Sequence, residues 1–239
     1  MISIEQQQKL FLSISRRLKK PITIYAVGGT AMMFLGIKDS TLDIDLVFEN
    51  HEDKKIFKDA IESLGYSPMD SVVVYGARKN KPEMFTLGDE RFDLFVGEVI
   101  DFVFSENMQK RAANIHQFEE KLILKIASPL DIILMKCATD RIKDRDDVRK
   151  IIENQTIGDK GINWKIILEE VKNQIKLGKP KAAFELGYFL ETLEKEIDLK
   201  VPKEITDELW KITKEQIKKM QRRESVMKKT KKESKKEKV

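Results

Sequence analysis

The pattern of residues 22–48 limits the possible folds of this chain more than any other part of its sequence. The run ITIYAV is rich in β-branched and aromatic residues, which predicts a strand. Gly28 and Gly29 follow as a turn, and TAMMFLG predicts a short helix. The next apolar run, LDIDLVF, predicts a second strand. A strand, a turn, a helix and a strand in so short a segment indicate a sheet covered by helices.

Two carboxylates interrupt the second strand at alternate positions. Because residues i and i+2 of a strand point to the same face, we expect Asp43 and Asp45 to lie side by side. Adjacent carboxylates repel each other, and a divalent cation is a common way to offset that repulsion. Oxygen ligands favour Mg²⁺ or Mn²⁺ over zinc. The alternative is a solvent-facing strand edge, where two aspartates cost little stability.

The glycine turn favours a second kind of ligand. A strand, a Gly-Gly turn and a helix start leave backbone N–H groups facing outward, and glycine lets a phosphate approach the backbone closely. Thr30 adds a hydroxyl at the start of the helix. Gly28, Gly29 and Thr30 are therefore candidate phosphate-binding residues. The alternative is an ordinary tight turn.

Together these elements resemble the signature of the nucleotidyltransferase superfamily, a glycine turn followed by two aspartates in a strand. Thirteen residues separate Gly29 from Asp43 in this chain. The superfamily has a third carboxylate on a later, neighbouring strand. Asp93, within RFDLFVG, fits that position best, and Asp101 remains an alternative.

A later segment, SPLDIILMKCATDRIKDRDDV, is similar to one in abortive-infection (AbiEii-type) toxin nucleotidyltransferases and their relatives. In those proteins a helix with a lysine precedes a basic residue, a Lys-Asp pair and a further aspartate. The matching residues here are Lys136, Arg141, Lys143, Asp144 and Asp147. The alternative is a solvated pair of helices with mixed charges.

The resemblance implies a Mg²⁺- or Mn²⁺-dependent transfer of an NMP from an NTP to an acceptor hydroxyl. Asp43, Asp45 and Asp93 would be the metal ligands and catalytic carboxylates. The glycine turn would bind the outer phosphates, and Lys136 or Lys143 would neutralise the departing pyrophosphate. Arg141 would bind a phosphate.

Asp144 and Asp147 would hold these cations in place instead of touching substrate. The resemblance further implies an RNA acceptor, often tRNA, or a protein acceptor, and an antitoxin protein as a partner. A catalytically silent nucleotide-binding or regulatory module of the same fold is the alternative function. A helical adaptor with an incidental pair of aspartates is a more distant one.

We predict an α+β fold with three parts. Residues 1–127 form a mixed β-sheet flanked by helices, residues 128–221 form an all-helical half, and residues 222–239 form a basic, disordered tail. The expected strands cover residues 22–27, 42–48, 71–75, 83–87, 91–96 and 120–127. The expected helices cover residues 3–19, 30–36, 51–64, 105–113, 129–140, 144–153, 163–177, 180–196 and 203–221.

The net charge of +5 comes from the tail. Residues 222–239 hold nine basic and three acidic groups, which leaves 36 basic against 37 acidic groups in residues 1–221. Such a tail is typically solvated, and it also allows a non-specific grip on RNA phosphates.

The remaining composition excludes several classes of protein. Cys137 is the single cysteine, and His51 and His116 are the two histidines. An internal disulfide and a Cys/His zinc site are therefore excluded. The sequence has no run of about 18 apolar residues to span a membrane. Its N-terminus lacks a signal pattern. We expect a cytoplasmic protein without a membrane partner.

Overall fold

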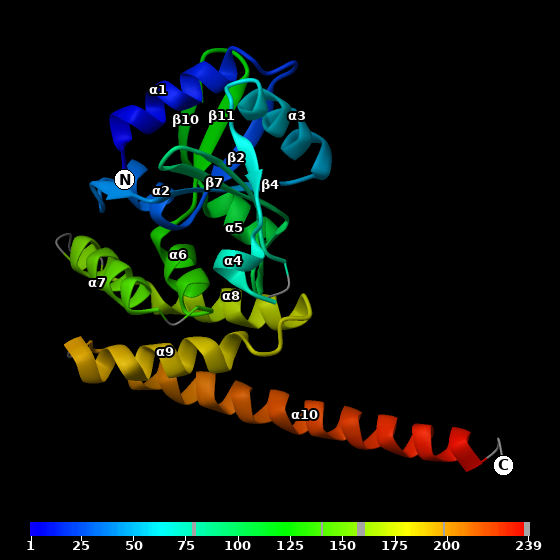
Figure 1. The fold of residues 1–239 in the computed structure, drawn as a ribbon. Helices are drawn as coiled ribbons and strands as arrows, with labels where there is room; N and C mark the ends of the chain where they lie inside the picture. Colours follow the sequence, from blue (N-terminus) through cyan, green and yellow to red (C-terminus); the bar gives the residue numbers. More distant parts are fainter. Residues whose placement is uncertain (78–79, 140, 157–160, 198, 237–239) are drawn as a thin grey trace.

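The computed structural model describes residues 1–77, 80–139, 141–156, 161–197 and 199–236, and a mixed β-sheet forms its N-terminal half (Figure 1). The strand order along the sheet is β10-β11-β2-β4-β7-β6-β5. A short extension, β8 and β9, continues from β7, and β1 pairs with β3 as a separate ribbon. The strands are β1 (Ile2–Ser3), β2 (Ile22–Ala26), β3 (Ser40–Thr41), β4 (Asp43–Phe48), β5 (Ser67–Met69), β6 (Glu83–Leu87), β7 (Glu90–Val96), β8 (Glu98–Val99), β9 (Phe102–Val103), β10 (Asn114–Phe118) and β11 (Leu122–Ile126).

Strand β4 lies at the centre of the sheet. It runs antiparallel to β2 and parallel to β7. The side chains of Ile44 and Leu46 are fully buried in the hydrophobic core. Period-two alternation therefore directs the intervening aspartates to the opposite face, as the sequence predicts.

Helices α1 (Ile4–Ser15), α2 (Gly28–Phe34), α3 (His51–Glu62) and α5 (Glu106–Arg111) flank the sheet. Ser3 and Gln6 form a capping box at the start of α1, and Asn50 caps α3 through the backbone N–H of Asp53. Phe11 of α1 and Phe57 of α3 are fully buried. Local capping and an apolar face thus explain where these helices begin and which side they bury.

Five helices make up the second half of the chain: α6 (Pro129–Lys136), α7 (Ile142–Thr156), α8 (Trp164–Lys176), α9 (Ala182–Ile197) and α10 (Lys203–Lys236). Ser128 caps α6 and Pro129 occupies its first turn, which is the start that the sequence predicts. Helix α6 packs against α2, α7 and α8, and α9 packs against α8 and α10. The predicted α+β fold, with a mixed sheet followed by a helical half, is confirmed.

The strand predicted at residues 71–75 is wrong. Val72–Tyr75 form a short helix, α4, and the neighbouring strand is β5 at Ser67–Met69. The carboxylate of Asp70 accepts a 2.8 Å hydrogen bond from the backbone N–H of Val72, which turns the chain into a helix. Strand propensity at the three valines is overridden by this turn.

Helix α10 continues to Lys236, beyond residue 222, where the sequence predicts that a basic tail begins. No glycine or proline lies within residues 203–236, and lysine, arginine and glutamate are strong helix formers. The end of α10 projects past the other helices (Figure 1). Residues 237–239 lie outside the described residues.

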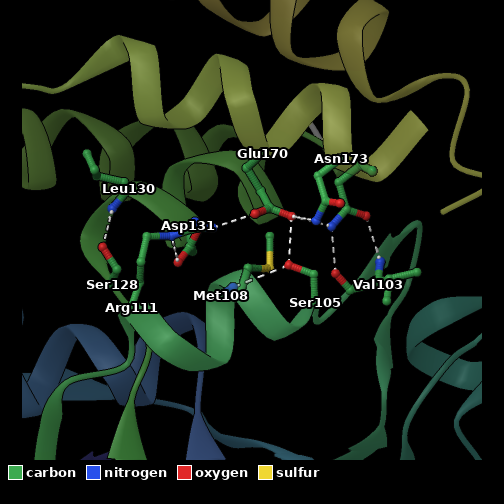
Figure 2. Close-up of polar contacts among 10 residues, drawn as sticks. Val103, Ser105, Met108, Arg111, Ser128, Leu130, Asp131, Glu170 and Asn173 are labelled. Atoms are coloured by element: carbon green, nitrogen blue, oxygen red, sulfur yellow. Dashed lines mark hydrogen bonds and ion pairs between the residues drawn. The ribbon is translucent and has the colours of Figure 1, made fainter. Parts of the chain in front are cut away.

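A buried ionic network joins the sheet half to the helical half (Figure 2). Arg111 of α5 donates to both carboxylate oxygens of Asp131 in α6, at 2.7 and 3.0 Å, and to Glu170 of α8 at 2.6 Å. Asp131 and Glu170 are each 1% exposed. One arginine therefore pairs with two carboxylates that come from separate helices.

The same network reaches the backbone of β9 (Figure 2). Gln174 of α8 accepts from the N–H of Val103 at 2.9 Å and donates to its carbonyl at 2.7 Å. Ser105 donates to Glu170 at 2.8 Å. Helix α8 is thus fixed to the sheet half by hydrogen bonds as well as by ionic contacts.

No helix among the described residues combines the length and the apolar character needed to cross a bilayer.

Candidate active site

The three predicted carboxylates lie on two adjacent strands. In the parallel register of β4 and β7, Asp45 is opposite Asp93 and Asp43 is opposite Arg91. Asp93 is fully buried, whereas Asp101 is exposed between β8 and β9. The structure therefore brings Asp93, and not Asp101, beside the aspartate pair.

The glycine turn lies directly against Asp45. Gly28 has a φ of +54°, and a Cβ atom there would come within 2.6 Å of the Asp45 carboxylate oxygen Oδ2. The backbone N–H of Val27 donates to the carbonyl of Asp45 at 3.1 Å. Glycine is required here for both its backbone conformation and its lack of a side chain. At Gly29, a Cβ atom would collide with Thr41.

The Thr30 hydroxyl forms hydrogen bonds with the backbone of strand β4. Its hydroxyl accepts from the backbone N–H of Asp45 at 3.0 Å and donates to the carbonyl of Asp43 at 3.4 Å. The residue is fully buried. In this structure its hydroxyl positions the two aspartates, and the predicted phosphate contact stays a prediction.

Lys136 is the centre of an ionic cluster at the end of α6. Its ammonium group lies 2.9 Å from Asp144 and 2.7 Å from Asp147. Arg141 also pairs with Asp144 at 2.7 Å, and Lys38 pairs with Asp147 at 2.9 Å. Burial alone would raise the pKa of Asp144 and Asp147, but Lys136 and the other partners lower both below their ordinary values. Each aspartate thus pairs with two cations of the site, and its predicted role of holding them in place stays a prediction.

Asp43 and Asp45, the glycine turn and the cations line one cavity, and Asp93 lies buried next to it. Lys143 lines it from the start of α7 and is exposed. The polar and glycine residues that line it are Gly28, Gly29, Lys38, Thr41, Asp43, Asp45, Tyr75, Lys136, Thr139, Arg141, Lys143, Asp144 and Asp147. Sequence reasoning did not identify Lys38 and Tyr75.

Arg91 is a further residue that sequence reasoning missed. It forms an ion pair with Asp43, and its Nε atom lies 3.2 Å from Oδ1 of Asp93. Neither this Nε nor this Oδ1 has a properly oriented hydrogen bond, although both are buried. The available signal was its position two residues before Asp93, which places both side chains on the same face of β7.

Tyr75 contacts the second carboxylate oxygen of Asp93, the one that Arg91 does not contact. Its hydroxyl donates to Oδ2 of Asp93 at 2.6 Å, and its ring packs against Phe95. Burial raises the pKa of Tyr75 well above its ordinary value, and the charges of Asp45 and Asp93 raise it further. The hydroxyl is therefore protonated and is a hydrogen-bond donor at neutral pH.

Comparison with known proteins identifies the family of the chain. Residues 1–177 match a family model described as "Nucleotidyltransferase of unknown function (DUF6036)". The chain belongs to this nucleotidyltransferase family. The match spans the site from Gly28 to Asp147 and ends just after α8, so that α9 and α10 lie outside it. No curated protein matches the chain. The more particular likeness to the AbiEii-type toxins stays a resemblance.

The donor atoms of this nucleotidyltransferase site suit a hard divalent cation. Burial raises the pKa of Asp45 to about 8, and the negative charges of Asp93 and Asp43 contribute to the rise. Burial raises the pKa of Asp93 to about 6, against the opposing effects of Tyr75 and Arg91. Oδ1 of Asp93 is a buried acceptor without a hydrogen bond. All-oxygen donors with excess negative charge fit Mg²⁺ or Mn²⁺.

A side chain of the protein itself bridges two of the carboxylates. Within the described ranges, no three carboxylate, histidine or cysteine side chains already converge as metal ligands do. Arg91 instead pairs with Asp43 and Asp93. A divalent cation held by these carboxylates would have to take the place of Arg91 at Asp43.

The raised pKa values predict how the stability of the metal-free protein depends on pH. Unfolded aspartates lose their protons at about pH 4. In the folded protein Asp93 keeps its proton to about pH 6 and Asp45 to about pH 8. The folded state binds more protons in this window, so these groups lower the free energy of unfolding as pH rises from about 4 to about 8. Thermal unfolding in chelator should show a smaller fall for Asp45→Asn than for the wild type. Equal pH profiles would contradict the prediction.

The substitution Gly28→Ala is expected to destabilise the protein more than Gly36→Ala. Both glycines have positive φ, which costs other residues about 1–2 kcal/mol. Gly36 has open space around it, whereas a methyl group at Gly28 would also displace the Asp45 carboxylate. Denaturant unfolding of both variants measures the difference. Equal losses would mean that the close contact with Asp45 has no energetic consequence.

Proposed function

We propose that the protein is a Mg²⁺- or Mn²⁺-dependent nucleotidyltransferase that moves an NMP from an NTP to an acceptor hydroxyl. One observation carries the proposal. Three carboxylates on β4 and β7 lie beside the glycine turn, in or next to a cavity that is also lined by Lys38, Lys136, Arg141 and Lys143. Negative charge for a cation and positive charge for phosphates are thus gathered at one site.

Asp43, Asp45 and Asp93 would hold the divalent cation. When bound, such a cation neutralises triphosphate charge and polarises the phosphoryl group under attack. To hold the cation, the Asp43 carboxylate would have to give up its ion pair with Arg91. Asp93 additionally orients the acceptor hydroxyl through the oxygen that now accepts from Tyr75.

The chain's own cations bind the triphosphate and stabilise the departing pyrophosphate. Lys136 is only 9% exposed and is fixed between two aspartates, so it provides an oriented charge. Arg141 and Lys143 are exposed at the cavity, where they reach the outer phosphates. A guanidinium binds phosphate oxygens with two N–H groups.

On the basis of the resemblance to nucleotidyltransferases, we also propose that residues 1–127 form the catalytic unit and that residues 128–221 form a helical unit that meets the acceptor or a partner. The proposed location is the cytoplasm. RNA or tRNA is the proposed acceptor, with protein as the alternative. The protein is further proposed to act as a toxin that is paired with an antitoxin protein. The basic end of α10 is consistent with an RNA acceptor.

The test is an incubation of purified protein with each NTP, labelled at the α-phosphate, in the presence of Mg²⁺. One set of lanes contains total RNA and a parallel set omits it. A labelled RNA or protein band that is lost in Asp45→Asn supports nucleotidyl transfer. Asp101→Asn is the matched control, because it removes an exposed carboxylate outside the cavity.

A second candidate function is nucleotide binding without turnover. Contacts of Arg91 with Asp43 and Asp93 favour it, because a resident arginine provides the carboxylates with a permanent counter-ion. This alternative predicts that NTP binds to the wild type and that no label is transferred in any lane.

A further inference from the structure

We propose that the protein nucleotidylates itself on Tyr75. The inference rests on the proposed function and goes beyond it, because it identifies an acceptor within the chain. An acceptor hydroxyl in this chemistry has to lie at the third carboxylate and face the triphosphate. The Tyr75 hydroxyl meets both conditions, since it lies 2.6 Å from Oδ2 of Asp93 and lines the cavity.

The other three tyrosines of the chain show that this placement is specific. Tyr25 and Tyr66 also donate to carboxylates, namely those of Glu49 and Glu90, but neither lines the cavity. Tyr188 is half exposed on α9, beyond the region of the family match. A hydrogen bond to a carboxylate is therefore common to three of the tyrosines, whereas access to the candidate triphosphate site belongs to Tyr75.

Helix α4 presents Tyr75 to the site. Asp70 turns the chain into α4, and Gly76, with a φ of +59°, turns it out again directly after Tyr75. The tyrosine ring contacts Phe95 of β7 at a centroid distance of 6.5 Å. The valines before it are exposed, with Val73 at 76%. The hydroxyl is thus held at Asp93 by the ring and its hydrogen bond, while the preceding residues face solvent.

The transfer step balances without a further reactant. The Tyr75 oxygen forms a bond to the α-phosphorus of the NTP as the bond from that phosphorus to the bridging oxygen breaks. Pyrophosphate leaves with the bridging oxygen, and the hydroxyl proton passes to the Asp93 carboxylate. The product is a phosphodiester between Tyr75 and the nucleoside, and one chain accepts one NMP.

The experiment is an intact-mass measurement of the full-length wild type, as isolated and after incubation with each NTP and Mg²⁺, followed by peptide mapping. The expected result is a gain of one NMP located on Tyr75. The variant Tyr75→Phe is expected to lose the adduct, whereas Tyr66→Phe, which removes a similar hydrogen bond outside the cavity, keeps it. Thermal unfolding of both variants checks that they fold.

The outcomes separate this inference from the proposed function. An NMP on another residue, or label on RNA with an unmodified Tyr75, overturns the self-modification and leaves nucleotidyl transfer standing. An adduct that persists in Tyr75→Phe overturns it as well. A chain that stays unmodified with every NTP overturns the self-modification. If, in addition, no label reaches RNA or protein and calorimetry detects no Mn²⁺ binding, the proposed function is overturned as well.

Discussion

Replacing Asp45 with asparagine is expected to abolish nucleotide transfer while it stabilises the metal-free protein. Loss of one pre-organised electrostatic group commonly lowers kcat by about 100- to 1,000-fold, and loss of a metal ligand should cost at least as much. Asp45 faces Asp93 and Asp43, and no ion pair with Asp45 is present within the described ranges. Asparagine removes the charge and keeps the shape.

The stabilisation should be clearest near pH 8, where the wild-type carboxyl group loses its proton. It should reach at least about 1.4 kcal/mol, the free energy that corresponds to one pKa unit. Calorimetric titration with Mn²⁺ and denaturant unfolding in chelator measure the two effects. The variant Asp43→Asn should be compared with Asp45→Asn. The Asp43 substitution also removes the ion-pair partner of Arg91, so this variant should be stabilised less. An Asp45→Asn protein that transfers nucleotide at the wild-type rate would exclude the metal assignment.

Replacing Arg111 with alanine is expected to lower the free energy of unfolding by about 3–5 kcal/mol, the usual cost of leaving a buried charge without its partner. The substitution leaves Asp131 and Glu170 buried and unneutralised between α5, α6 and α8. Since the network joins the two halves of the chain, the helical half should also lose its attachment to the sheet half. Chemical denaturation followed by both fluorescence and circular dichroism measures the loss.

Lys110→Ala is the matched control for that experiment. Lys110 precedes Arg111 in the same helix and pairs with Glu106 at 3.9 Å, with both side chains largely exposed. Such a pair contributes about 0–1 kcal/mol. A loss for Arg111→Ala that is no larger than for Lys110→Ala would show that the buried network does not hold the halves together.

The aspartate pair and its orientation could be predicted from the sequence because they depend on local rules. Strand periodicity alone places Asp43 and Asp45 on one face, and the glycine turn is recognisable from its composition. Asp93 could be preferred over Asp101 because its flanking residues favour a strand, but the sequence does not show that this strand pairs with β4. Strand pairing is set by tertiary packing and not by the residues next to the motif.

The contacts of Arg91 and Tyr75 could not be predicted from the sequence for the same reason, because they depend on tertiary packing. Arg91 reaches Asp43 only through the register of β4 against β7, and Tyr75 reaches Asp93 only because residues 72–75 form a helix. Three consecutive valines favour a strand by propensity, which is why a strand is predicted for residues 71–75. The turn made by Asp70 was the local signal that would have corrected it.

The most direct test of nucleotidyl transfer is a paired labelling experiment on the wild type with Mg²⁺. The NTP carries its label at the α-phosphate in one reaction and at the γ-phosphate in the other, and total RNA is present in both. Label retained on RNA or protein from the α-position, with the γ-label released as pyrophosphate, is the predicted result. Label retained from the γ-position would identify a kinase-type transfer and contradict the assignment.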